Sequence, residues 1–154
     1  MYKTSRLFAL AVSLLVCLQA AAIDHPGITR PGVAPGRFSL IEDGVPAAVV
    51  TDPSDERGVL IAAESLREDF ARVCGRKAPE QGARAILAGT LDSPLIKRLV
   101  SEGAVDVSAI RGQYETYILA APVQADGYGE VLVVAGADMR GAIYGIYEVS
   151  EQLG

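Results

Sequence analysis

The chain has 154 residues, which is enough for one domain with its own hydrophobic core. Its formal net charge is −5, and no stretch gathers basic residues into a patch, which excludes nucleic acid as an expected partner. Half of the residues are hydrophobic but only 6% are aromatic, so we expect an aliphatic core.

The N-terminus has the three parts of a secretory signal peptide. Lys3 and Arg6 precede an apolar run from Leu7 to Leu18, and the alanines at 20–22 then form an A-x-A cleavage pattern. The run of 12 residues is shorter than the roughly 20 that cross a bilayer. We therefore predict a signal peptide over residues 1–22, cleavage near Ala22, and a secreted or periplasmic protein. The alternative is an uncleaved interfacial anchor.

The two cysteines are treated differently by this cleavage. Cys17 lies inside the signal peptide, and Val16 stands where a lipobox needs a small residue, so lipidation is only an alternative. Cys74 remains alone in the mature chain, which excludes an internal disulfide and indicates a buried structural cysteine. Cleavage also removes two basic residues and no acidic one, so the net charge changes from −5 to −7.

Residues 23–37 are rich in proline and glycine and are interpreted as a linker. The only histidine, His25, lies in it. The segment from residue 38 onward therefore has no histidine, which excludes Ser-His and Cys-His nucleophilic chemistry. It also has no cluster of metal-ligand residues, and we expect neither a metal nor a cofactor.

From residue 38 to residue 154 the pattern predicts one α/β (α+β) domain with the order ββαβαββα and a mixed sheet of about five strands. The first two strands, at 38–41 and 47–50, flank a turn at Asp43-Gly44. The third, at 85–88, follows a helix and is expected to run parallel to the second. The last two, at 114–121 and 130–135, are predicted to form a hairpin around an eight-residue loop.

The first helix is expected to begin after a cap at Asp52 and to end at a left-handed cap at Gly75. Its predicted polar face carries Arg67 and two ion pairs, Glu64–Arg67 and Glu68–Arg72. Its predicted apolar stripe consists of Val59, Ala63, Leu66, Phe70 and Val73. A second helix is predicted over 93–101.

The last helix, from about residue 138 to residue 154, is predicted to have Asp138 as its cap. Ala142, Ile146 and Val149 line one face of it. Gly141 and Gly145 interrupt it at a cost of about 1 kcal/mol each relative to alanine. We infer that another backbone or a bulky ring approaches the helix closely at these two glycines.

Three segments contain residue types that catalysis or anion binding could use. Glu115 and Asp138 are the candidate carboxylate pair for glycoside hydrolysis, but Asp138 is better explained as a helix cap and Glu115 as a strand or turn residue. The turn at Gly89-Thr90 has the form of a weak anion site at a helix start, with an ordinary turn favoured. The segment 136–141 lacks the Lys-Ser/Thr pair of a phosphate-binding loop. No residue is therefore predicted to be catalytic.

Arg140, Tyr144 and Tyr147, spaced by four and three, form a polar and aromatic strip on the last helix beside Gly141 and Gly145. One interpretation is a solvated or half-buried helix face. The other is a docking face for a neighbouring domain, because arginine and aromatic residues anchor interfaces. These five residues are the candidate site.

The run VVAGADMRGAIYGIY at 133–147, with Ser150-Glu151 and the final glycine, resembles the end of the N-terminal domain of family 115 glycoside hydrolases. Upstream segments resemble that domain in the same order, namely Gly75-Arg76-Lys77, Gly89-Thr90 and 112–117. A looser form of the pattern is similar to the accessory domains of family 67 glucuronidases and of family 20 and 84 hexosaminidases.

The resemblance implies an α-glucuronidase that removes 4-O-methylglucuronic acid side chains from xylan. It also implies that residues 38–154 are an accessory N-terminal domain, with the catalytic carboxylates on a following (β/α)8 barrel as its partner. No catalytic position of the family falls in this chain. The alternative is a free-standing secreted module that binds carbohydrate or protein.

Overall fold

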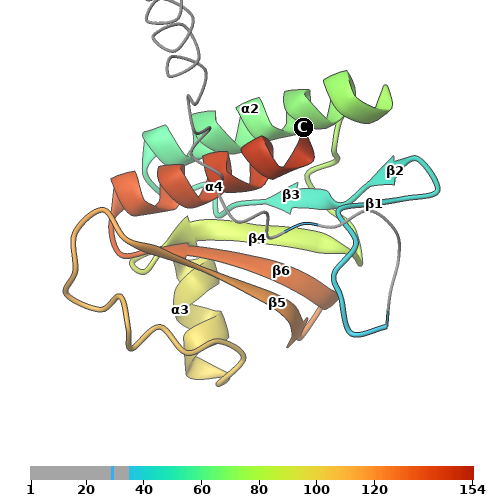
Figure 1. Ribbon diagram of the computed structural model, residues 1–154. Coiled ribbons are helices and arrows are strands. Elements are labelled where there is room, and N and C mark those ends of the chain that lie inside the picture. The colour runs from blue at the N-terminus through green and yellow to red at the C-terminus, as the bar shows by residue number, and fades with distance from the viewer. Residues whose placement is uncertain (1–28, 30–34) are drawn as a thin grey trace, which may run out of the picture.

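A computed structural model describes residue 29 and residues 35–154 (Figure 1). The predicted signal peptide, the site of its cleavage and most of the linker lie outside the described residues. Within the described part, no helix is long and apolar enough to cross a membrane.

The described chain opens with a short β-hairpin, β1 (Ile41–Glu42) and β2 (Val45–Pro46), and continues into β3 (Ala48–Val50). Asp43 and Gly44 both have positive φ angles, 50° and 71°, which is the conformation that a tight two-residue hairpin turn requires. The predicted turn is confirmed. The strand expected at 38–41 contributes only its last residue, Ile41, to β1.

The main sheet has four strands in the order β3-β4-β6-β5, with β4 at Ala85–Thr90, β5 at Tyr117–Ala125 and β6 at Gly129–Gly136. β3, β4 and β6 run parallel, and β5 pairs antiparallel with β6. The mixed sheet and the parallel β3–β4 pair are confirmed. The difference from the expected five strands is that β1 and β2 form a separate two-stranded sheet.

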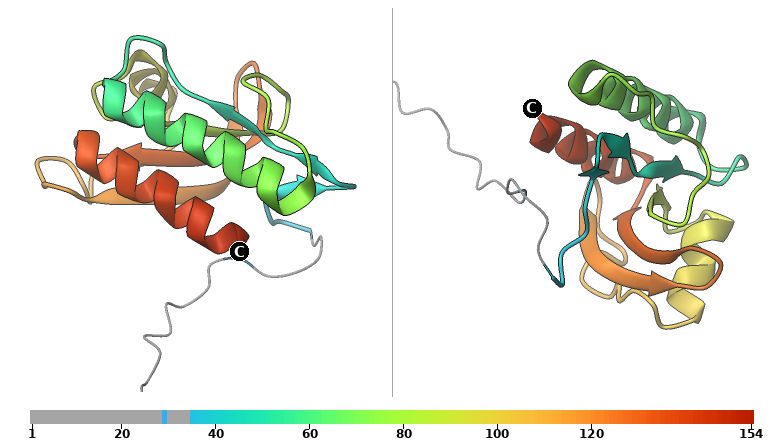
Figure 2. Two further views of the ribbon diagram at one scale, coloured as in Figure 1. Left: turned by 90° about the horizontal axis from the view of Figure 1, so that it is seen from above. Right: turned by 90° about the vertical axis from the view of Figure 1, so that its right-hand side faces the viewer.

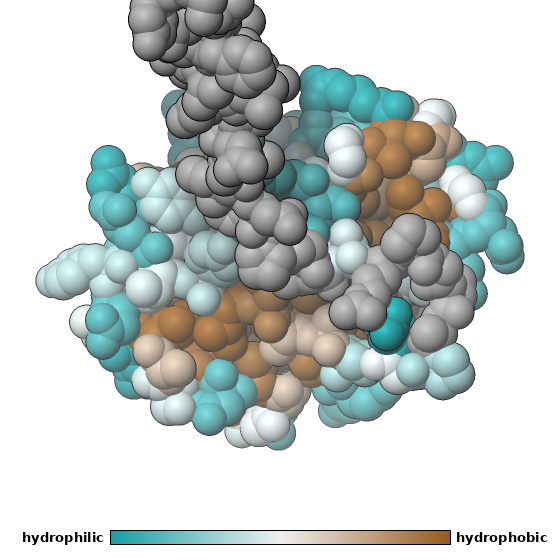
Figure 3. Space-filling view, in the orientation of Figure 1, coloured by the Kyte–Doolittle hydropathy of each residue, from teal (hydrophilic) through white to brown (hydrophobic). Residues whose placement is uncertain are grey.

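The hairpin of β5 and β6 differs from the prediction in its loop. The strands continue to Ala125 and Gly129, and a register shift between Ala120 and Val123 accommodates Pro122, which has no N–H for the ladder. β5 is an edge strand without a charged residue, and Figure 3 shows hydrophobic surface over this part of the molecule. A proline and a bulge at a free edge hinder further strand pairing.

Helices cover both faces of the sheet (Figures 1 and 2). α2 (Arg57–Cys74) and α4 (Met139–Leu153) lie side by side on one face, and α3 (Pro94–Ser101) lies on the other. Each face has its own aliphatic core, and the described residues of both cores lie between Phe38 and Leu153. Both cores are therefore built within this segment.

The N-terminus of α2 differs from the prediction. Asp52 does not cap the helix, because its carboxylate accepts hydrogen bonds from the N–H and hydroxyl of Ser54 in the preceding turn. The N-cap position is Glu56, which makes no side-chain capping bond. Asp55 instead reaches β4, where it accepts hydrogen bonds from the Thr90 N–H (2.9 Å) and hydroxyl (2.8 Å). The predicted cap at Gly75 is confirmed, with φ 75°.

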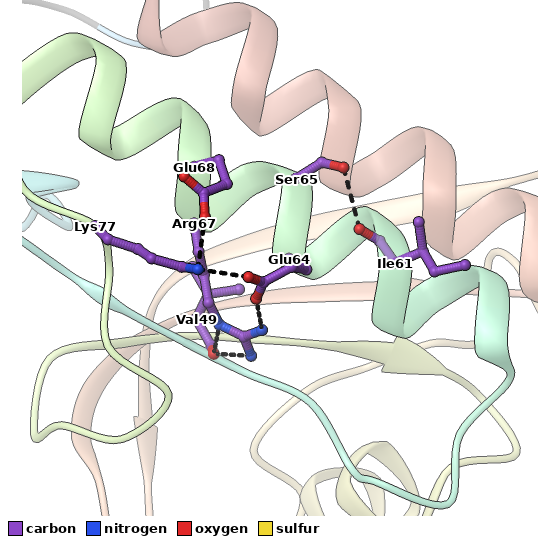
Figure 4. Close-up of polar contacts among 7 residues, drawn as sticks. All are labelled: Val49, Ile61, Glu64, Ser65, Arg67, Glu68 and Lys77. Atoms are coloured by element: carbon purple, nitrogen blue, oxygen red, sulfur yellow. Dashed lines mark hydrogen bonds and ion pairs between the residues drawn. The ribbon is translucent and has the colours of Figure 1, made fainter.

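Two residues of α2 lie on a different face from the one predicted, Arg67 and Val73, and Figure 4 shows the first of them. The sequence predicts Arg67 on the polar face, but in the structure Arg67 is buried, with only 7% of its surface exposed. Its Nε and Nη2 donate to the Val49 carbonyl at 3.2 and 2.8 Å, and Nη1 pairs with Glu64 as predicted. β3 is an edge strand, so this carbonyl points away from β4 and the guanidinium supplies its hydrogen bonds. Val73, expected in the apolar stripe, is 43% exposed.

The ion pair predicted between Glu68 and Arg72 does not form. Arg72 pairs with Asp69, and Glu68 pairs with Lys77, which also binds Glu64. Most of the charges on the outer surface of α2 are thus paired within the domain. Cys74 at its end is half-buried, and its thiol donates to the Phe70 carbonyl.

Candidate functional site

The candidate site begins at the N-terminus of α4, where Asp138 organises the surrounding backbone. Its carboxylate accepts hydrogen bonds from the Gly141 N–H (2.8 Å) and the Glu115 N–H (3.0 Å). These donors, Gly141 first and Glu115 second, hold the pKa of Asp138 below its ordinary value. The predicted helix cap is confirmed, and the same side chain also holds the segment that leads into β5.

The two glycines of α4 mark the close approach that the sequence predicted. A Cβ on Gly141 would lie 2.1 Å from the Thr116 carbonyl oxygen. A Cβ on Gly145 would lie 2.7 Å from Val134 Cγ1 and 3.0 Å from the Tyr117 ring. A backbone approaches the first glycine and a ring approaches the second, so the inferred contact is confirmed in both forms.

These contacts divide the five candidate residues between two faces of α4. Gly141 and Gly145 are buried and face Thr116 and Tyr117. Arg140, Tyr144 and Tyr147 are exposed, the two tyrosines at 44% and 48%. The structure therefore brings together the three side chains of the strip, while the glycines position the helix behind them.

Glu115 and Tyr114 adjoin this strip and were not part of the predicted site. Glu115 has a φ of 56°, a left-handed conformation that is uncommon for residues other than glycine. Asp138 binds its N–H, and Arg140 forms an ion pair with its carboxylate, which raises the pKa of Arg140. Tyr114, 86% exposed, precedes it. Backbone strain was the missed signal, and it depends on tertiary contacts that the sequence does not display.

The structure gives the candidate carboxylates, Glu115 and Asp138, other roles. Asp138 is bound by two backbone N–H groups, and Glu115 is paired with Arg140. Among residues 35–154 and Thr29, no group of three or more acidic, cysteine or histidine side chains could hold a metal ion. The geometry here is that of a structural junction between α4 and β5.

The Gly89-Thr90 turn binds a carboxylate of the same chain, that of Asp55. The sequence offered this turn, which precedes α3, as a weak anion site. The Asp55 carboxylate occupies it and accepts a hydrogen bond from the Thr90 N–H. A Cβ on Gly89 would lie 2.7 Å from Asp55 Oδ2, so the glycine makes room for this carboxylate. The ordinary interpretation of the turn is therefore supported, with an intramolecular carboxylate as the ligand.

A groove of about 700 Å³ lies along the free edge of β3. Thr51, Leu60, Arg67, Gln81 and Tyr128 are among the residues that line it. Glu64 already balances the charge of Arg67, and the Val49 carbonyl takes two of its N–H groups. The Arg67 guanidinium in this groove is thus already bound to the edge strand β3 and to Glu64.

Comparisons with known proteins give a structural likeness without a sequence-family match. Neither the protein-family profiles nor the curated proteins yield a match to the chain. Among solved structures, one similar chain is a family 115 4-O-methyl-α-glucuronidase with specificity for decorated arabinogalactans. The TM-score is 0.55 and the sequence identity 26%.

The match covers 70% of this chain but only 13% of the glucuronidase. The fold described above is therefore similar to one small part of a much longer glycoside hydrolase. This likeness links the chain to glycoside hydrolases at the level of a domain.

Proposed function

We propose that this chain is an accessory, non-catalytic domain of a secreted glycoside hydrolase of the α-glucuronidase type. The structural likeness to part of a family 115 glucuronidase is the observation that carries the proposal. The role assigned to the run at 133–147 supports it. Asp138, Gly141 and Gly145 serve to hold β5 against α4, which is a packing function.

The proposed partner is a (β/α)8 catalytic domain of the same polypeptide, which would supply the hydrolytic carboxylates. The similar glucuronidase acts on decorated arabinogalactans. The substrate expected from the resemblance was xylan. Both descriptions share a 4-O-methylglucuronic acid side chain, so we propose this group, rather than either polysaccharide backbone, as the common element of the substrate.

The test is a comparison of two polypeptides. The first is residues 23–154, and the second is the product of the complete natural reading frame that contains them. We expect the first to release no 4-O-methylglucuronic acid from decorated arabinogalactan or xylan, and the second to release it. Release by residues 23–154 alone, or a complete frame without a glycosidase domain, would contradict the proposal and favour a free-standing binding module.

Export is tested separately. We propose that the protein leaves the cytoplasm and that its mature N-terminus is Ile23. Expression with the native leader, fractionation and N-terminal sequencing measure both. Recovery of an intact Met1 terminus from the membrane fraction would instead support an uncleaved anchor.

A further inference from the structure

The outer face of α4 carries a regular stripe that extends the predicted strip by one residue, Glu151. Arg140, Tyr144, Tyr147 and Glu151 follow one another at spacings of four, three and four, which places them in one row along the helix. All four are exposed. The opposite row, with Ala142, Ile146 and Val149, is buried against the sheet. Tyrosine and arginine are enriched in interfaces, so the outer row has the composition of a contact surface.

The charges at the two ends of this stripe have the wrong sign for an isolated helix. Arg140 lies in the first turn, where the helix dipole favours anions, and Glu151 lies near the last turn, where it favours cations. Arg140 is paired with Glu115. Among the described residues, none forms an ion pair or hydrogen bond with the Glu151 side chain. The Glu151 end would therefore gain from a partner of opposite charge, and the exposed Arg140 could share its charge with a second carboxylate.

We propose that this stripe is the contact surface for a second copy of the chain, with the two α4 helices packed antiparallel about a two-fold axis. In that arrangement Arg140 faces Glu151 of the other copy, and Tyr144 faces Tyr147. The register fits all four residues, since one axis midway between Tyr144 and Tyr147 relates both pairs. Along each helix the charged ends are about 17 Å apart, so the two rows have equal length.

The charge pattern selects a second copy over other occupants. A two-fold interface must be self-complementary, and a row that reads Arg-Tyr-Tyr-Glu meets this condition only when its copy is antiparallel. In the antiparallel arrangement the positive end of each helix dipole lies beside the negative end of the other, which is favourable. It also places an opposite charge at each end of the row. This proposal goes beyond the glycosidase proposal and requires that the catalytic domain of the complete enzyme leaves this stripe uncovered.

The expected dimer is weak. The contact is essentially one helix row, smaller than the roughly 800 Å² per partner of a standard stable interface. Each copy also carries a net negative charge, which opposes association. We therefore expect a dissociation constant in about the micromolar to millimolar range.

The experiment is a charge exchange followed by sedimentation velocity on residues 23–154, which contain the complete described core. The parent should show concentration-dependent dimerisation. Arg140→Glu and Glu151→Arg each bring like charges together at both ends of the interface, and each should weaken the dimer by about tenfold or more. An equimolar mixture of these two variants restores both opposite-charge contacts and should form a heterodimer. The double variant should dimerise with itself.

Glu151→Arg leaves the Arg140–Glu115 pair intact, so it separates loss of the dimer from disturbance at Glu115. Glu80→Arg makes the same change of charge in an exposed loop and should leave the dimer at least as strong as in the parent. A chain that is monomeric throughout the accessible range, or a dimer that both exchanges leave unchanged, would overturn the proposal. A complete enzyme whose own catalytic domain covers Tyr144 and Tyr147 would also overturn it.

Discussion

Helices α2 and α4 lie side by side on one face of the sheet, yet the sequence holds them there by different means. α2 is 18 residues long and buries Val59, Leu66 and Phe70 in a broad apolar row. Most of its outer charges are paired within the domain, as the contacts of Lys77 with Glu64 and Glu68 illustrate. Ion pairs within the domain thus occupy much of its outer surface, although Ile61 and Val73 are also exposed there, at 55% and 43%.

α4 is shorter, at 15 residues, and gives up helix propensity at two glycines. In return its backbone comes close enough for Thr116 and Tyr117 to pack beneath it. Its outer row holds two exposed tyrosines and a glutamate without an ion-pair partner among the described residues. The difference indicates that α2 packs through a continuous apolar row, whereas α4 holds β5 through its glycines. In the dimer that we propose, the outer row of α4 would also contact a second copy.

The largest expected effect comes from adding one methyl group to each helix and comparing the losses of stability. Gly141→Ala in α4 places a Cβ 2.1 Å from the Thr116 carbonyl oxygen, and neither backbone can yield without moving the cap at Asp138. We expect a loss of about 3 kcal/mol or more in the free energy of unfolding, measured by urea denaturation.

Gly58→Ala in α2 is the matched control. Its Cβ would meet the ends of Ile143 and Met139 at 3.0 Å, and flexible side-chain ends can shift. Alanine is also the better helix former, so we expect a change within about 1 kcal/mol. Equal effects of the two substitutions would contradict the distinction between the helices.

A second test compares two arginines of α2. Arg67→Met leaves the Val49 carbonyl at the sheet edge without the guanidinium that binds it. An unsatisfied buried acceptor costs about 1–3 kcal/mol, and we expect a destabilisation of this size. Arg72→Met removes an exposed pair with Asp69 and should change stability by no more than about 0.5 kcal/mol. Urea denaturation of both variants measures the contrast, and similar losses would mean that Arg67 does not close the edge.

The sequence predicted α4 better than α2 in one instructive respect. A glycine inside a helix is unfavourable, so two glycines four residues apart signal a contact that only a missing Cβ allows. The structure supplies that contact at Gly141 and at Gly145. The signal is local in the chain, even though its cause, the approach of β5, is tertiary.

Arg67 and Asp55 had no such local signal. Arg67 follows Leu66 directly, at the margin of the apolar stripe, and its burial depends on where the carbonyl of an edge strand points. Asp55 is one of several residues of capping type between Asp52 and Glu56, and its role is determined by a hydrogen bond from Thr90 in β4. The left-handed Glu115 is likewise held by Asp138 and Arg140 from a distant segment. These roles follow from tertiary neighbours, which periodicity and capping rules do not contain.

The finest contrast between the two helices is at their N-caps. Asp138 caps α4 as a carboxylate, and its backbone donors lower its pKa, whereas Glu56 of α2 makes no side-chain bond. A depressed folded-state pKa stabilises the fold above the unfolded value of about 3.9 and loses this effect as pH falls through the lower, folded value. An asparagine side chain in place of the Asp138 carboxylate could still accept one of the two hydrogen bonds, but it would not titrate.

We therefore expect Asp138→Asn to be less stable than the parent at pH 7 and the difference to shrink as pH falls below about 4. Glu56→Gln makes the same change of charge at the N-cap of α2 without breaking a side-chain hydrogen bond, so its effect at pH 7 should be smaller. Urea denaturation at a series of pH values measures both curves. A deficit of Asp138→Asn that persists unchanged at low pH would show that the carboxylate charge is not what holds β5 to α4.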